Sequence, residues 1–97
     1  MANTKSAIKQ MRQSEKRRVR NRVVRTTART FVKTANEVIA EGDQALAAEA
    51  VREAISKLDQ ARQKGVIHAN NAARRKSRLM KRLNALQQQA EQPQQES

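Results

Sequence analysis

Hydrophobic residues recur at steps of three and four along three stretches of the chain, which is the spacing of an amphipathic helix. The first stretch ends at Gly42, and its second half carries the clearest apolar stripe. This stripe consists of Val24, Ala28, Phe31, Ala35 and Val38. We expect a helix from about residue 4 to residue 41, capped by Asn3 or Thr4, with a length of roughly 57 Å.

The N-terminal half of this helix lacks an apolar stripe. Val19 is the only apolar residue among residues 12–22, and more than half of the others are cationic. A helix that is polar on all sides either bridges solvent or is not stable by itself. We interpret this half as an arm that folds fully against an anionic partner.

Two shorter helices are expected at about residues 44–64 and 69–90. Asp43 is a suitable N-cap for the first of them, and Gly42 and Gly65 occupy positions typical of helix C-caps. Lys76 interrupts the apolar face of the last helix, where its long aliphatic stem can still cover apolar surface. The expected buried residues are Ala47, Ala50, Val51, Ala54, Ile55, Leu58 and Ala61 in one helix and Ala69, Ala72, Leu79, Leu83, Leu86 and Ala90 in the other.

No segment alternates with the period of a strand, so we predict an all-α fold. Short connections make consecutive helices antiparallel, which gives one domain over residues 1–90 with three helices running up, down and up. The first helix exceeds the others by roughly 25 Å, so its basic half should project from the bundle. Met11 and Met80 are interpreted as packing residues, and the polar residues 91–97 as a disordered tail.

Positive charge is concentrated in the first and third helices. The 97 residues carry a formal net charge of +12. Residues 1–33 hold 11 basic residues and 1 acidic residue. Residues 34–65 hold 4 basic and 6 acidic residues, and residues 66–90 hold 6 basic residues and no acidic residue. This imbalance predicts binding to a polyanion. Arginine outnumbers lysine, and its guanidinium group binds phosphate bidentately.

Helical spacing groups these cations into faces. On the third helix, the face opposite the leucines holds Arg74, Arg78, Lys81 and Arg82. One side of the first helix holds Lys9, Arg12, Lys16, Arg17 and Arg20, and another holds Arg18, Arg22, Arg25 and Arg29. Cations on several sides suit a partner that surrounds the arm, such as converging RNA helices, better than a single duplex groove.

The sequence offers no constellation for catalysis or for cofactor binding. Cysteine is absent, the two glycines are far apart, and His68 is the only histidine. We therefore expect no enzyme, no metal site, no cofactor and no small-molecule substrate. His68 is expected to cap the third helix or to contact RNA, and so are Asn70 and Asn71. Phe31 is the only aromatic residue, which argues against domains that stack bases on aromatic platforms.

Two runs of residues resemble one family. The first run is Ala2-Asn3-Thr4-Lys5-Ser6-Ala7-Ile8-Lys9, followed by Arg12, Glu15-Lys16-Arg17-Arg18 and Asn21. The second is Lys64-Gly65-Val66-Ile67-His68, Asn70, Ala72-Ala73-Arg74, Lys76-Ser77-Arg78-Leu79 and Lys81-Arg82-Leu83-Asn84. Together they resemble the signatures of the S-twenty family of bacterial and plastid small-subunit ribosomal proteins, over about residues 2–87.

This resemblance implies a three-helix bundle that binds small-subunit (16S) ribosomal RNA beside other small-subunit components and stabilises the RNA fold during assembly. It implies a place on ribosomes, in the cytoplasm or the plastid stroma. Matching positions give RNA-facing roles to Lys5, Lys9, Arg12, Lys16, Arg17, Arg18, Asn21, His68, Asn70, Arg74, Lys76, Ser77, Arg78 and Arg82. The same basic helices add Arg20, Arg22, Arg25, Arg29, Arg75 and Lys81 as candidates. Ala69 and Asn71 depart from the family pattern, in which basic residues are expected there.

Three other classes of protein share parts of this pattern. A nucleoid-type DNA-binding protein shares the charge, but it would show a dimer seam or a short recognition helix. A coiled-coil protein would sustain its heptads and would leave the basic arm unexplained. A helix lying on a membrane surface needs bulky apolar residues opposite its basic face, and no apolar run is long enough to span a membrane.

Overall fold

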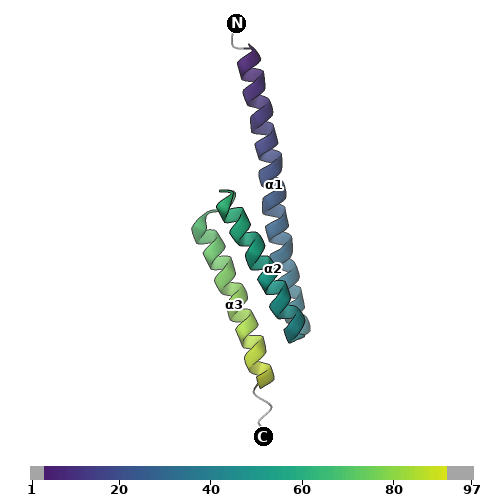
Figure 1. Cartoon of the computed structure of the whole chain (residues 1–97). Helices are drawn as coiled ribbons and strands as arrows, with labels where there is room; N and C mark the ends of the chain where they lie inside the picture. Colours follow the sequence, from purple (N-terminus) through teal and green to yellow (C-terminus); the bar gives the residue numbers. More distant parts are fainter. Residues whose placement is uncertain (1–3, 92–97) are drawn as a thin grey trace.

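The computed structural model describes residues 4–91, which form three α-helices (Figure 1). They are α1 (Thr4–Glu41), α2 (Gln44–Gln63) and α3 (Ala69–Glu91). The chain turns back after α1 and again after α2, so α2 and α3 lie along the C-terminal half of α1. The predicted all-α bundle, with its three helices running up, down and up, is confirmed.

The helix bounds lie close to those expected. The first helix has the expected bounds, α2 ends one residue early with Lys64 as its C-cap, and α3 continues one residue further, to Glu91. Asn3, the other N-cap candidate, and residues 92–97, most of the expected tail, lie outside the described residues.

Local interactions explain where the helices end. Gly42 and Gly65 have φ angles of 90° and 76°, in the left-handed region where a side chain would be strained. The backbone N–H of Val66 donates to the carbonyl of Ala61 at 2.9 Å, which closes α2. The side chain of Asp43 accepts the N–H of Leu46 at 3.1 Å, as an N-cap does.

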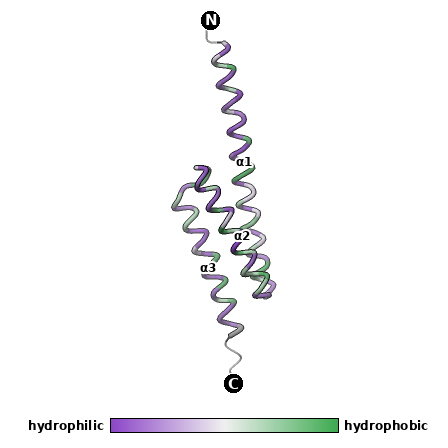
Figure 2. The backbone as a smooth tube through the Cα atoms, viewed as in Figure 1, coloured by the Kyte–Doolittle hydropathy of each residue, from purple (hydrophilic) through white to green (hydrophobic). Residues whose placement is uncertain are grey.

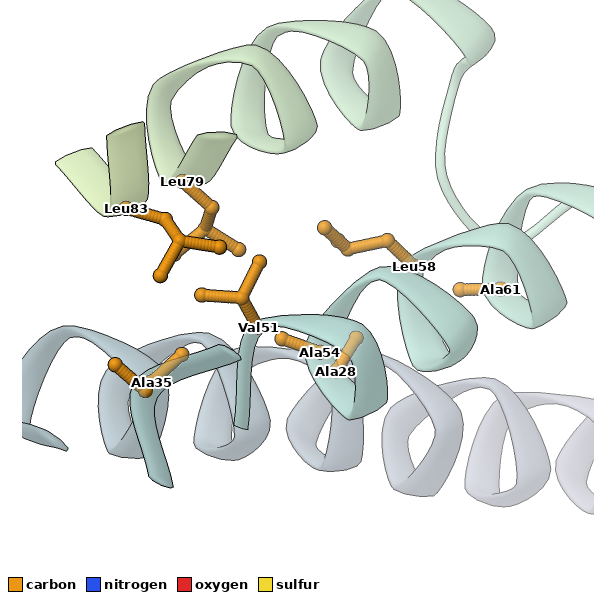
Figure 3. Close-up of a cluster of buried hydrophobic side chains, with 9 residues drawn as sticks. Ala28, Ala35, Val51, Ala54, Leu58, Ala61, Leu79 and Leu83 are labelled. Carbon is orange, nitrogen blue, oxygen red and sulfur yellow. The ribbon is translucent and has the colours of Figure 1, made fainter. Parts of the chain in front are cut away.

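A small core joins all three helices (Figure 3). Alanines on α1 and α2 allow these two helices to approach closely, and Leu79 and Leu83 extend from α3 toward Val51 of α2. The residues of this core are Ala28, Ala35, Ala47, Val51, Ala54, Leu58, Ala61, Leu79 and Leu83. Because α2 supplies five of these nine core residues, it is the central element of the bundle.

Several residues expected in the core are less buried than predicted. Ala50, Ile55, Ala69 and Leu86 are only half-buried, since three helices leave the margins of each apolar face open. The side chain of Ala90 lies outside the described residues.

The interpretation of the two methionines as packing residues was wrong. Met11 is 68% exposed because it lies on the arm, where no other helix reaches. Met80 is 42% exposed and borders a shallow hollow between α2 and α3.

The N-terminal half of α1 projects beyond the bundle, as predicted (Figure 1). Every side chain from Ile8 to Arg20 is exposed, and this half of the helix is predominantly hydrophilic (Figure 2). The molecule measures 81 × 21 × 13 Å along its principal axes, so the arm makes it long and thin. Among residues 4–91, no helix has the length and apolar character needed to cross a membrane.

Candidate nucleic-acid interface

Arginines of α1 and α3 meet along one side of the bundle. A hollow of about 420 Å³ is lined by Val32 and Asn36 of α1 and by Asn71, Arg74, Arg75, Arg78, Leu79 and Arg82 of α3. A second hollow of about 270 Å³ is lined by Arg25, Ala28, Arg29, Leu58, Val66, Ile67, His68, Asn71 and Arg75. The two hollows share Asn71 and Arg75, so they form one continuous surface, the arginine groove.

The helices bring these six arginines together by simple spacing. Arg25 and Arg29 are four residues apart on α1, and Arg74, Arg78 and Arg82 follow at steps of four on α3, which places each set on one helix face. The first turn of α3 lies where the arm leaves the bundle (Figure 1). Within the described residues, no aspartate or glutamate lines either hollow, so the arginines that line the groove have no acidic neighbour there.

Two asparagines orient arginines of the groove. Nη1 of Arg82 donates to Oδ1 of Asn36 on α1 at 2.6 Å. Nε of Arg75 donates to Oδ1 of Asn71 at 2.9 Å. A neutral amide holds a guanidinium group without cancelling its charge, and the remaining N–H donors stay available for phosphate.

Sequence reasoning missed Asn36 and left the role of Asn71 open. Asn71 lies four residues before Arg75, and Asn36 lies seven residues after Arg29. Both spacings place the amide on the same helix face as the arginine. A search for polar residues at these spacings could have found them.

His68 acts as a cap of α3. Its Nδ1 accepts the N–H of Asn70 at 3.0 Å, and its carbonyl accepts the N–H of Ala72 at 3.0 Å. Of the two roles predicted for His68, the structure thus shows capping. The same side chain lines the end of the arginine groove, beside Arg25 and Arg29.

Lys76 lies apart from the groove. Its Nζ is 3.0 Å from Oδ1 of Asp59 on α2, and both side chains are partly buried. Asn70, Ser77 and Lys81 are exposed, and helical geometry places them on the face of α3 opposite its leucines. The expectation that Arg74, Arg78 and Arg82 share that face was wrong, because these arginines line the groove together with Leu79.

The candidate residues of the arm are spread around its surface. Arg18 and Arg22 continue the row of Arg25 and Arg29 along α1, away from the bundle. Eight cations of the arm are exposed, namely Lys5, Lys9, Arg12, Lys16, Arg17, Arg18, Arg20 and Arg22. Glu15 is 3.6 Å from Arg18, and both side chains are more than 60% exposed, so this ion pair stabilises the helix little.

Asn21 lies where the arm joins the bundle. Its side chain is partly buried, and its Oδ1 has no hydrogen-bond partner within the described part of the chain. A buried acceptor without a partner has a free-energy cost, so a donor from a bound partner would stabilise this position.

The chemistry of the surface is that of an anion-binding site. Guanidinium and ammonium groups supply positive charge and N–H donors, which match phosphate oxygens. Within residues 4–91, no group of three or more histidine, aspartate or glutamate side chains is arranged to hold a metal ion.

Comparison with known proteins agrees with the resemblance stated above. The family model of "Ribosomal protein S20" matches residues 2–84. The chain is 59% identical over 86 residues to the small ribosomal subunit protein bS20 of Thermomicrobium roseum, covering 89% of this chain and 87% of that protein. It is 55% identical to the bS20 of Geotalea uraniireducens, and this match covers 89% of this chain and 99% of that protein. It is 49% identical to the bS20 of Bacillus cytotoxicus, and this match covers 88% of this chain and 100% of that protein. The chain therefore belongs to the ribosomal protein S20 family and is a structural component rather than an enzyme.

Proposed function

We propose that this protein is a constituent of the small ribosomal subunit that binds 16S ribosomal RNA directly and stabilises its fold during assembly. The relatives named above are small ribosomal subunit proteins. Their names support a place in that subunit, and the basic surface of this chain supports direct contact with RNA. The other partners are then neighbouring components of the same particle, and the protein is located where ribosomes are.

The arginine groove carries this proposal. Six arginines from two helices converge on one surface that no acidic side chain lines. Such a concentration of like charge repels itself and is stabilised by a polyanion. A groove flanked by guanidinium groups suits the irregular phosphate backbone of a folded RNA better than a flat charged surface would.

The arm extends the same RNA-binding surface beyond the bundle. Its cations have no neighbouring helix, and Glu15 is the only acidic residue among residues 4–33. The binding surface then comprises the twenty residues named from the sequence, with the groove arginines at its centre. Lys76 joins this surface only after its ion pair with Asp59 opens.

Equilibrium binding to 16S ribosomal RNA across a salt series tests the proposal, with transfer RNA and duplex DNA as competitors. We expect a steep salt dependence, with a slope of roughly −0.7 to −0.9 per phosphate neutralised. Binding to the ribosomal RNA should also survive an excess of both competitors at physiological salt. Equal displacement by all of them would contradict a specific ribosomal site and favour a nucleoid-type DNA-binding protein.

A further inference from the structure

The seam between α2 and α3 is the one seam of the bundle that α1 does not border. A hollow of about 270 Å³ lies on it and is lined by Ala48, Val51, Arg52 and Ile55 of α2 and by Met80 and Leu83 of α3. Five of these six side chains are apolar, and none belongs to α1. A ligand in this hollow therefore approaches the bundle from the side away from α1.

The floor of this hollow belongs to the core, whereas its rim is open to solvent. Val51 and Leu83 are 1% and 7% exposed, and they point toward one another between the two helices (Figure 3). Met80 is 42% exposed although it borders these buried side chains. An exposed apolar side chain beside an apolar hollow is typical of a surface that another protein covers. Methionine suits such a surface, because its unbranched side chain adapts to the shape of a partner.

A second hollow continues the seam toward the end of α2. It has a volume of about 480 Å³ and is lined by Asp59, Arg62, Gln63 and Lys76. Asp59 lies one turn after Ile55 on α2, and Lys76 lies one turn before Met80 on α3, so the two hollows follow each other along the same pair of helices. The seam covers residues 48–63 of α2 and is roughly 22 Å long, the length of about four helical turns. A groove of this length between two helices can accept a third helix.

The charges on this seam favour a partner with acidic side chains. Among the described residues, Asp59 is the one carboxylate that lines either hollow, and it is 3.0 Å from Lys76. Arg52 and Arg62 are exposed, and neither has an ion-pair partner within residues 4–91. The seam thus presents two unpaired guanidinium groups beside an apolar hollow, and carboxylates of a partner would pair with them.

Other occupants fit this seam less well. RNA is bound through its phosphates and its exposed bases, and the five apolar side chains of the first hollow supply neither positive charge nor an aromatic ring. A second copy of the chain carries the same net charge of +12, so two copies repel each other. An acidic helix from another protein has the opposite charge and can carry an apolar ridge for the hollow.

We propose that the seam between α2 and α3 is a docking site for an amphipathic helix of another protein. An aliphatic ridge on that helix fills the hollow at Met80, and carboxylates on its flanks pair with Arg52 and Arg62, as in other cases of helix-in-groove recognition. None of the residues that line the seam also lines the arginine groove. The partner can therefore bind while the groove is occupied, and the inference does not depend on RNA binding.

A defined peptide and the full-length protein test this site. The probe is a fluorescein-labelled helix of about four turns, with leucines at steps of three and four and glutamates on both flanks. Fluorescence anisotropy at physiological salt compares it with a scrambled peptide of the same composition and with a lysine-flanked peptide. The glutamate-flanked helix should bind at least about tenfold more tightly than either of them. Equal binding of the scrambled peptide would overturn the site, because it would show only a general attraction of anions to a cationic protein.

Substitutions locate the peptide on the seam. Met80→Asp should weaken binding of the glutamate-flanked peptide at least about tenfold, because the new carboxylate replaces an apolar contact and repels the glutamates. Gln88→Asp is the matched control, with an expected change of less than about threefold, because it adds the same charge at an exposed position of α3 that lines neither hollow. Arg52→Glu should shift the preference toward the lysine-flanked peptide. An unchanged affinity of Met80→Asp, or an unchanged preference of Arg52→Glu, would contradict the proposed docking.

Two further measurements distinguish the other occupants. Sedimentation of the protein alone should show a monomer, and an oligomer that Met80→Asp dissociates would instead assign the seam to a second copy. Met80→Asp and Gln88→Asp should bind 16S ribosomal RNA equally well, and a selective loss in Met80→Asp would assign the seam to RNA. Either result would overturn the proposal. Arg74→Gln/Arg78→Gln should weaken RNA binding and retain peptide binding, so a failure of the docking site is distinguishable from a failure of the proposed function.

Discussion

Arg82 of α3 donates a hydrogen bond of 2.6 Å to Asn36 of α1, across 46 residues of sequence. This bond joins the two walls of the arginine groove and limits the positions that the guanidinium group can adopt. A charged group that is already oriented loses less conformational freedom when it binds. We therefore regard Asn36 as a positioning residue for RNA binding.

Replacing Asn36 with alanine should weaken RNA binding about three- to tenfold, the range expected for one lost hydrogen bond. The same replacement made together with Arg82→Ala should have no further effect, because the amide acts through that arginine. A double-mutant cycle of RNA affinities measures this coupling. Additive losses in the cycle would instead assign Asn36 an effect independent of Arg82.

Leu79→Asp should unfold the bundle. Leu79 is 2% exposed and packs in the core shared by the three helices, so the change buries an unpaired carboxylate at a cost of about 3 to 5 kcal/mol. Thermal melting followed by circular dichroism measures the loss. Met80→Asp is the matched control, because that neighbouring side chain is 42% exposed and should change stability by less than about 0.5 kcal/mol. Unchanged melting of Leu79→Asp would show that the core is misassigned.

Deleting residues 1–20 should separate folding from RNA binding. The described core lies entirely outside this segment, so the shortened protein should remain helical and melt cooperatively. RNA affinity should fall by a factor on the order of 100 or more, because the deletion removes seven cations. Circular dichroism and equilibrium binding measure the two effects. Full affinity without the arm would contradict its role in binding.

Gly65→Ala should destabilise the bundle through the backbone alone. An added Cβ meets no atom within 4 Å, but the φ angle of 76° is unfavourable for alanine by about 1 kcal/mol. Urea unfolding measures the change. Gly65→Asn should lose less, because asparagine tolerates the left-handed region better. If Gly65→Ala is as stable as the unmodified protein, then the positive φ angle at residue 65 does not require glycine, and the prediction is wrong.

Lys76→Gln should weaken RNA binding less than Arg78→Gln. The ammonium group of Lys76 already lies 3.0 Å from Asp59, whereas Arg78 lines the groove. The comparison uses the affinity of each variant for 16S ribosomal RNA at one salt concentration. Equal losses would indicate that the ion pair opens on binding and that Lys76 then contacts RNA.

The sequence alone predicted the features that depend on neighbouring residues. Helix ends followed from Asp43, Gly42 and Gly65, because a cap is made by atoms a few residues apart. The projecting arm followed from the length of the first helix and its missing apolar stripe. The concentration of positive charge on the first and third helices followed from counting charged residues in each segment, which needs no knowledge of packing.

Tertiary structure decided which side chains meet. Periodicity defines a face on each helix, but it does not fix how a helix is rotated against its neighbours. The Asn36–Arg82 bond, the Lys76–Asp59 ion pair and the arginine groove all depend on that rotation. Met80 differed from expectation for the same reason, because only packing decides which apolar side chains at the margin of a face are covered. Each of these contacts joins residues far apart in the chain, and only the assembled bundle brings them together.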